Sequence, residues 1–119
     1  MREVFAQDAV VAMTADGDER APGAAVTVSL CGHWDHEPPC PLAPHHTAVE
    51  RDGDLVRLRV LFAADPGDEA EVRRRIAQAL LDGHVVTPEG AEAEWELLSA
   101  GPGVVRPEEH DHGRRLVAS

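Results

Sequence analysis

The sequence predicts an α+β fold in which a small mixed β-sheet of about four to five strands packs against one main helix. Three observations predict it: alternating apolar residues over 54–62, an Asp-Gly turn signal just before them, and a helical apolar stripe over 66–82. We expect a single α+β domain over residues 1–119, because a chain of this length forms one modest core.

The N-terminal half predicts two strands and a loop. Residues 9–13 are compatible with a short strand, and residues 24–31 alternate between apolar and polar side chains. This period of two predicts a half-buried strand over 24–31. The segment 31–46 contains prolines at positions 38, 39, 41 and 44. Because proline interrupts both helices and sheet ladders, we expect a stiff, irregular loop here.

A β-hairpin is predicted over residues 45–62, with its turn at Asp52-Gly53. A two-residue turn at this point pairs His45 with Val60. Successive strand residues point to opposite faces, so His45 faces the core and His46 the opposite side. The buried face of the second strand then consists of Val56, Leu58, Val60 and Phe62.

The main helix is predicted over residues 66–82, opened by Asp65-Pro66 and ended by Gly83. Its apolar stripe is Val72, Ile76, Ala79 and Leu80. Two ion pairs with a spacing of four residues are expected on its surface, Glu69 with Arg73 and Glu71 with Arg75. We interpret the run Arg73-Arg74-Arg75 as helix solvation.

The C-terminal third is harder to interpret. Residues 88–98 fit either a helix or a strand, and the alternation of alanine, tryptophan and leucine with glutamate favours a strand. A strand here completes a β-α-β crossover with the preceding strand and helix, and Trp95 is expected in the core. The tail contains an acidic, histidine-bearing stretch over 108–112, and residues 114–118 are compatible with a short final strand.

Composition excludes several classes of function. The chain has 22 acidic and 11 basic residues, a formal net charge of −11. This charge argues against nucleic acid and anionic membranes as partners, since both require clustered cations. No apolar run approaches the length of a membrane span, and the N-terminus lacks the apolar core of a secretion signal. We therefore expect a cytoplasmic protein, in which cysteines serve metal or redox chemistry more often than disulfides.

The segment 31–46 concentrates metal-ligating side chains, including both cysteines and four of the seven histidines of the chain. The candidate ligands are Cys31, His33, His36, Cys40, His45 and His46. Two thiolates and two imidazoles form a recognised tetrahedral zinc set, although the spacing matches no standard zinc finger. Because His45 and His46 face opposite ways in a regular strand, we expect only one of them to bind the ion.

The acidic tail contains secondary metal candidates, His110 and His112. These two histidines either bind a divalent ion loosely or join the main site if the tail folds back. The other interpretation is a solvated acidic tail without a specific role.

The function predicted is a small metal-binding protein with zinc in a structural or interaction role, or a carrier or sensor of copper or nickel. Its partners would be the metal ion and a further protein. One alternative is a small zinc-dependent hydrolase, in which three protein ligands leave water on the metal. Two further alternatives need no metal: a Cys31–Cys40 disulfide that closes the loop, and an interaction domain with solvated loop histidines.

Overall fold

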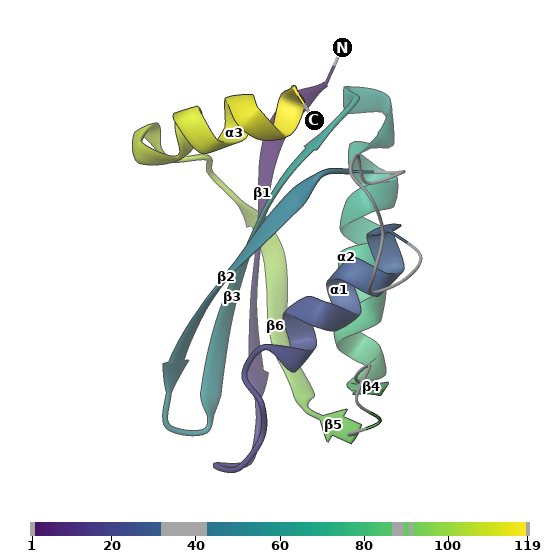
Figure 1. Cartoon of the computed structure of the whole chain (residues 1–119), viewed down its shortest axis with the longest axis vertical. Coiled ribbons are helices and arrows are strands. Elements are labelled where there is room, and N and C mark those ends of the chain that lie inside the picture. Colours follow the sequence, from purple (N-terminus) through teal and green to yellow (C-terminus); the bar gives the residue numbers. More distant parts are fainter. Residues whose placement is uncertain (1, 32–42, 87–89, 91, 119) are drawn as a thin grey trace.

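The computed structural model describes residues 2–31, 43–86, 90 and 92–118, and these form an α+β fold (Figure 1). The strands are β1 (Glu3–Ala12), β2 (His45–Asp52), β3 (Leu55–Ala64), β4 (His84–Val86), β5 (Glu92–Glu94) and β6 (Glu96–Gly103). The helices are α1 (Ala21–Cys31), α2 (Glu69–Asp82) and α3 (His110–Val117). Short 3-10 turns, Pro66–Asp68 and Pro107–Glu109, precede α2 and α3.

The main sheet has the strand order β2-β3-β1-β6, and every neighbouring pair is antiparallel. The α+β class is thus confirmed, whereas the expected mixed sheet is antiparallel throughout. Since β3 and β6 both run opposite to β1 between them, they are parallel to each other and are joined through α2. This is the predicted β-α-β crossover with one strand inserted, the topology termed ferredoxin-like, which by itself implies no function.

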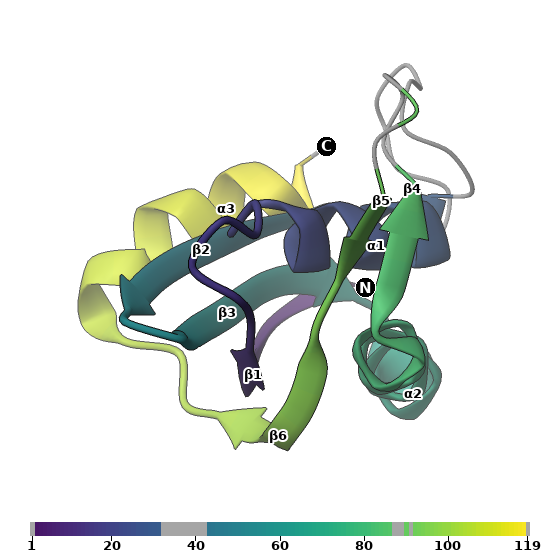
Figure 2. The ribbon, with the colours of Figure 1, turned by 90° about the horizontal axis from the view of Figure 1, so that it is seen from below.

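The two faces of the sheet are covered differently. Helices α1 and α2 lie on one face, and α3 lies on the other (Figures 1 and 2). We call these the α1/α2 face and the α3 face. The main core fills the α1/α2 face, with Phe62, Ile76 and Leu80 fully buried. A smaller apolar cluster of Ala6, Leu61, Ala63 and Leu116 lies beneath α3.

Residues 24–31, predicted as a strand, are instead part of helix α1. The buried residues Ala21, Ala25, Val26 and Leu30 follow helical spacing. The alternation of apolar side chains over these few positions also fits a helix that is apolar around most of its circumference. Alanines raise the helix propensity of the segment, and packing against α2 outweighs the strand preference of its valines.

The hairpin over 45–62 is confirmed, with its turn one residue later than predicted. Asp52 pairs with Leu55, so the two-residue loop is Gly53-Asp54, and Gly53 has the positive φ of 61° that such a loop requires. His45 therefore pairs with Phe62 instead of Val60. Because the shift in pairing is an even number of residues, every side chain keeps its predicted face.

The predicted helix over 66–82 is confirmed as one 3-10 turn followed by α2, and the four residues of its predicted apolar stripe are buried. Gly83 ends the helix with a φ of 68°, where an added Cβ would lie 2.5 Å from the carbonyl oxygen of Trp95. Both predicted ion pairs are present, Glu69–Arg73 at 2.8 Å and Glu71–Arg75 at 2.9 Å.

Arg73 does more than solvate the helix. Its guanidinium donates to the carbonyl oxygen of Ala6 at 2.7 Å and to Oε1 of Gln7 at 2.6 Å. It also lies over the Phe62 ring, 5.4 Å from the ring centroid. Arg73 therefore fastens α2 to β1.

The C-terminal third follows the prediction in part. Residues 92–103 form strands β5 and β6, and Trp95 between them is buried and donates from Nε1 to the carbonyl oxygen of Leu80 at 2.9 Å. The N-terminal end of the predicted strand includes residues 88, 89 and 91, which lie outside the described residues. The expected final strand over 114–118 is wrong, because this segment belongs mostly to α3, which buries Leu116 against the sheet. Within the described residues, no helix is long and apolar enough to span a membrane.

Candidate metal centre

His45 and His46, where the donor segment enters β2, point to opposite faces of the sheet as predicted. On the α1/α2 face, Nδ1 of His45 lies 3.1 Å from the carbonyl oxygen of Ala43. Its Nε2 lies 3.0 Å from Oγ1 of Thr27 on α1. Both ring nitrogens of His45 are therefore hydrogen-bonded within the fold, and metal binding by this residue would break one of these bonds.

His46, on the α3 face, contacts a histidine from the far end of the chain. The rings of His46 and His112 have centroids 4.8 Å apart and planes inclined by 51°. His46 is exposed and His112 is half-buried. The C-terminal tail thus folds back onto the sheet, and the secondary candidate His112 meets His46 of the main donor set.

Apolar packing holds α3 against the sheet beside this histidine pair. Leu116 is buried with Leu61 and Ala63 of β3 and with Ala6 of β1. At Gly113 the helix approaches β1 so closely that an added Cβ would lie 2.8 Å from a methyl group of Val4. The small residue at 113 and the leucine at 116 together bring the helix onto the sheet.

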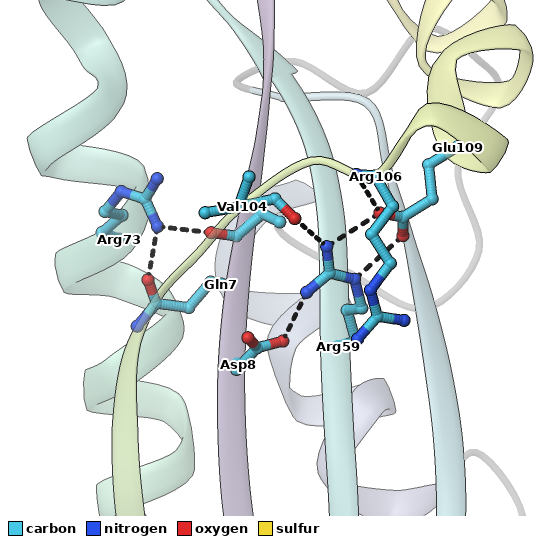
Figure 3. Close-up of polar contacts among 8 residues, drawn as sticks. Gln7, Asp8, Arg59, Arg73, Val104, Arg106 and Glu109 are labelled. Carbon is cyan, nitrogen blue, oxygen red and sulfur yellow. Dashed lines mark hydrogen bonds and ion pairs between the residues drawn. The ribbon is translucent and has the colours of Figure 1, made fainter.

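A half-buried arginine, Arg59, anchors the beginning of α3 (Figure 3). Arg59 of β3 donates through Nε and Nη2 to the two carboxylate oxygens of Glu109, at 2.9 and 2.8 Å. Its Nη1 donates to Asp8 at 2.9 Å, and Nη2 also donates to the carbonyl oxygen of Val104. This two-pronged guanidinium–carboxylate pair fixes both distance and orientation. Glu109 directly precedes α3, so the pair determines where His112 lies.

The charges of this anchor shift the pKa values of its members. Hydrogen bonds from Arg59, and then from the backbone N–H of Arg106, lower the pKa of Glu109 to about 2. The same contact with Glu109 raises the pKa of Arg59.

The pKa of His112 is lowered, first by burial and then by the charges of His46 and Arg115. A lowered pKa favours the neutral imidazole, the form that binds metals.

Some of the remaining sequence-predicted residues lie among the described residues and some lie outside them. His33, His36 and Cys40 lie outside the described residues, and Cys31 is the last residue of α1. His110 is exposed at the first position of α3. In residues 2–31, 43–86, 90 and 92–118, no three or more His, Cys, Asp or Glu side chains form a group able to hold a metal ion.

Sequence reasoning missed the anchor and therefore the meeting of the two histidines. The alternation of residues 54–62 puts Arg59 on the face opposite the buried Leu58 and Val60, and the structure agrees. Nothing local connects Arg59 with Glu109, since the two residues belong to distant segments that meet only in the folded chain. The one available signal is Leu116, an apolar residue in a short, charged C-terminal stretch. It lies three positions after Gly113, a spacing that puts both residues on one side of a helix.

Comparison of this chain with protein-family models, with curated proteins and with solved structures gives no match.

Proposed function

We propose that this chain binds one transition-metal ion, most suitably zinc, through His46, His112 and donors of the segment 31–46. The observation that carries the proposal is the 4.8 Å approach of the His46 and His112 rings. This approach occurs where the cysteine- and histidine-rich segment joins β2. The remaining ligands would come from Cys31, His33, His36 and Cys40.

The chain length between these donors supports the proposal. Cys40 precedes His46 by six positions, and a fully extended chain of that length spans roughly 20 Å. Thiolate and imidazole together suit zinc, and the same donors accept copper or nickel. The net charge of −11 attracts cations in general.

A structural or interaction role follows from where such an ion would sit. It would connect three parts of the chain: the donor loop, the beginning of β2 and the helix α3. Four protein ligands leave no open position for water, so the ion would cross-link the fold and order the loop as a surface for a partner protein. Three protein ligands plus water would instead favour the hydrolase alternative.

Metal analysis of the untagged protein tests the proposal. We expect about one zinc, copper or nickel ion per chain by elemental analysis, and loss of this ion in the Cys31→Ser, Cys40→Ser double variant. Removal of the bound ion with a chelator should lower the midpoint of thermal unfolding, because ligands of the native state stabilise it.

Single histidine variants then identify the ligands by competition with a chromophoric chelator. His46→Ala and His112→Ala should each weaken zinc binding at least tenfold. His84→Ala is the matched control, because His84 is exposed on β4 and belongs to the small second sheet. A folded chain that binds no transition metal contradicts the proposal. So does zinc affinity that is unchanged in both the His46 and the His112 variants.

A further inference from the structure

The α3 face of the sheet has a hollow that α3 does not fill. An open groove of about 620 Å³ lies over the central parts of β1, β2 and β3 and is bordered by β6. Along β2 it begins at Ala48, two residues beyond His46, and along β3 it includes Arg59 and Arg57. The groove therefore continues the same face from the point where the helix leaves it.

Small side chains form the floor of the groove. Ala48 of β2 and Val10 of β1 line it together with Ser99 and Gly101 of β6, which pair with Val10 and Asp8 on this face. At the other end of this face, Leu116 of α3 packs on Ala6, Ala63 and Leu61. Among the described residues, no apolar side chain covers the groove in the way that Leu116 covers the cluster beneath α3. The volume lies within the range of small-molecule sites, roughly 300–1,000 Å³.

The charges around the groove are reversed relative to the chain as a whole. Acidic residues outnumber arginines 22 to 11 in the sequence. The groove is lined by three arginines, Arg57, Arg59 and Arg106, and by two acids, Asp8 and Glu50. Since Arg59 already pairs with Asp8 and Glu109, its charge is neutralised within the fold.

The other two arginines form no close ion pair in the described part of the chain, although the charge of Arg106 helps to lower the pKa of Glu109 and Arg57 lies opposite Glu50 in the β2–β3 pairing. Within the described residues, neither Arg57 nor Arg106 forms an ion pair through its guanidinium. Both side chains line the groove, and Arg57 is exposed on the strand β3. A guanidinium binds a carboxylate through two parallel hydrogen bonds, which gives both strength and orientation. An apolar floor beside two unpaired guanidiniums suits a ligand that is apolar with one acidic end.

We propose that this groove binds a small amphiphilic organic anion. Its acidic group would lie against Arg57 and Arg106, and its hydrocarbon body would cover Val10 and Ala48. Nucleic acids and other polyanions do not fit, because the chain as a whole carries a net charge of −11. The groove and its two arginines involve none of the proposed metal ligands, so this proposal is independent of the metal.

Titration with octanoate and octan-1-ol, followed by amide NMR spectra of the intact chain, tests the proposal. Octanoate should bind saturably with one molecule per chain and shift the amide signals of Val10, Ala48 and Gly101. Octan-1-ol has the same hydrocarbon body without the charge and should bind at least tenfold more weakly.

Arginine variants test the role of the two guanidiniums. The double variant Arg57→Gln, Arg106→Gln should weaken octanoate binding at least tenfold. Arg74→Gln, Arg114→Gln is the matched control, since it changes the net charge equally but removes exposed arginines of α2 and α3 that lie outside the groove. The control variant should bind octanoate like the parent chain. If the groove variant does not fold, anion recognition is tested by comparing the affinities of the parent chain for octanoate and octan-1-ol, which should differ at least tenfold.

Several results would overturn the proposal. The proposed site would be excluded if octanoate did not bind, or if it shifted only amide signals outside the groove. Equal affinity for octanoate and octan-1-ol, or unchanged affinity in the double variant, means an apolar hollow without anion recognition. Signals of the groove that move when the ligand-free protein is diluted would show that a second copy of the chain occupies this face.

Discussion

The two faces of the main sheet are formed by the same strands and have different chemistry. The α1/α2 face is covered by two helices (Figure 1) and holds the main core, which buries Phe62 and packs against Phe5. The α3 face is covered only at one end, and it carries His46, Arg59 and an open groove. The α1/α2 face thus holds most of the apolar packing, whereas the α3 face combines a small apolar anchor with polar groups, to which both proposed binding sites belong.

Neighbouring residues show how sharp this division is. His45 is hydrogen-bonded at both ring nitrogens to Thr27 and to the backbone on the α1/α2 face. The next residue, His46, meets only the ring of His112 among the contacts described above. A single step along the strand therefore separates a structural histidine from a candidate ligand.

The largest effect expected comes from truncating the cores of the two faces at Leu61 and Phe62. Phe62→Ala removes a fully buried ring from the main core and should lower the free energy of unfolding by about 3–5 kcal/mol. Leu61→Ala affects the smaller cluster under α3 and should cost about 2–3 kcal/mol, because a cluster near the surface relaxes more easily. Chemical denaturation measures both values, and a larger loss for Leu61→Ala would reverse the assignment of the main core.

The hairpin strands β2 and β3 and the helix α2 could be predicted because their signals are local. An Asp-Gly pair and alternating valines and leucines specify the hairpin, and the helix over 66–82 has a complete apolar stripe between a proline and a glycine. The segment 24–31 lacks such a signal. Its apolar residues fit both periods, and only packing against α2 selects the helix.

The candidate site could be predicted only on one side. Strand alternation is enough to place His46 opposite His45. The meeting with His112 depends on Arg59 and Glu109, which are fifty positions apart, and on Gly113 fitting against Val4. Periodicity contains no information about such long-range pairs, so the sequence alone leaves the contacts of residues 108–112 open.

The second prediction separates two arginines of the α3 face that lie on the same strand. Arg59→Met leaves the carboxylate of Glu109, only 19% exposed, without its partner and should cost about 1–3 kcal/mol. Arg57→Met is the matched control, since Arg57 is exposed, and should change stability by no more than about 0.5 kcal/mol. Equal effects in urea denaturation would contradict the anchor described above.

The third prediction is the acid sensitivity of the α3 anchor. The pKa of Glu109 is about 2 in the folded chain and near its ordinary value of 4.5 when unfolded. The unfolded chain therefore binds more protons between these values, and the stabilisation present above about pH 4.5 is lost as the pH falls toward 2. Over this pH interval, the free energy of unfolding of the Glu109→Gln variant should fall by about 1–2 kcal/mol less than that of the parent chain.

The control for this acid titration is Glu108→Gln, which changes the exposed neighbour of Glu109. It should reproduce the pH dependence of the parent chain when unfolding is followed by circular dichroism. A parent-like curve for Glu109→Gln would show that the Arg59–Glu109 pair does not contribute to acid sensitivity.

The smallest effect expected is at the turn of the hairpin that contributes to both faces. Gly53 has a φ of 61° and no atom within 4 Å of an added Cβ, so Gly53→Ala should cost about 1 kcal/mol through backbone strain alone. Gly67 has equal space and no positive φ, and Gly67→Ala should be close to neutral. Thermal unfolding of both variants gives the difference, and equal midpoints would contradict the turn geometry.

The division between the two faces is tested most directly by NMR of the histidine ring nitrogens during addition of zinc. The proposal predicts that one ring nitrogen each of His46 and His112 shifts to the metal-bound position at one equivalent of zinc, while His45 and His84 keep their shifts. Metal-bound signals at His45, or none at both His46 and His112, would contradict a metal centre on the α3 face.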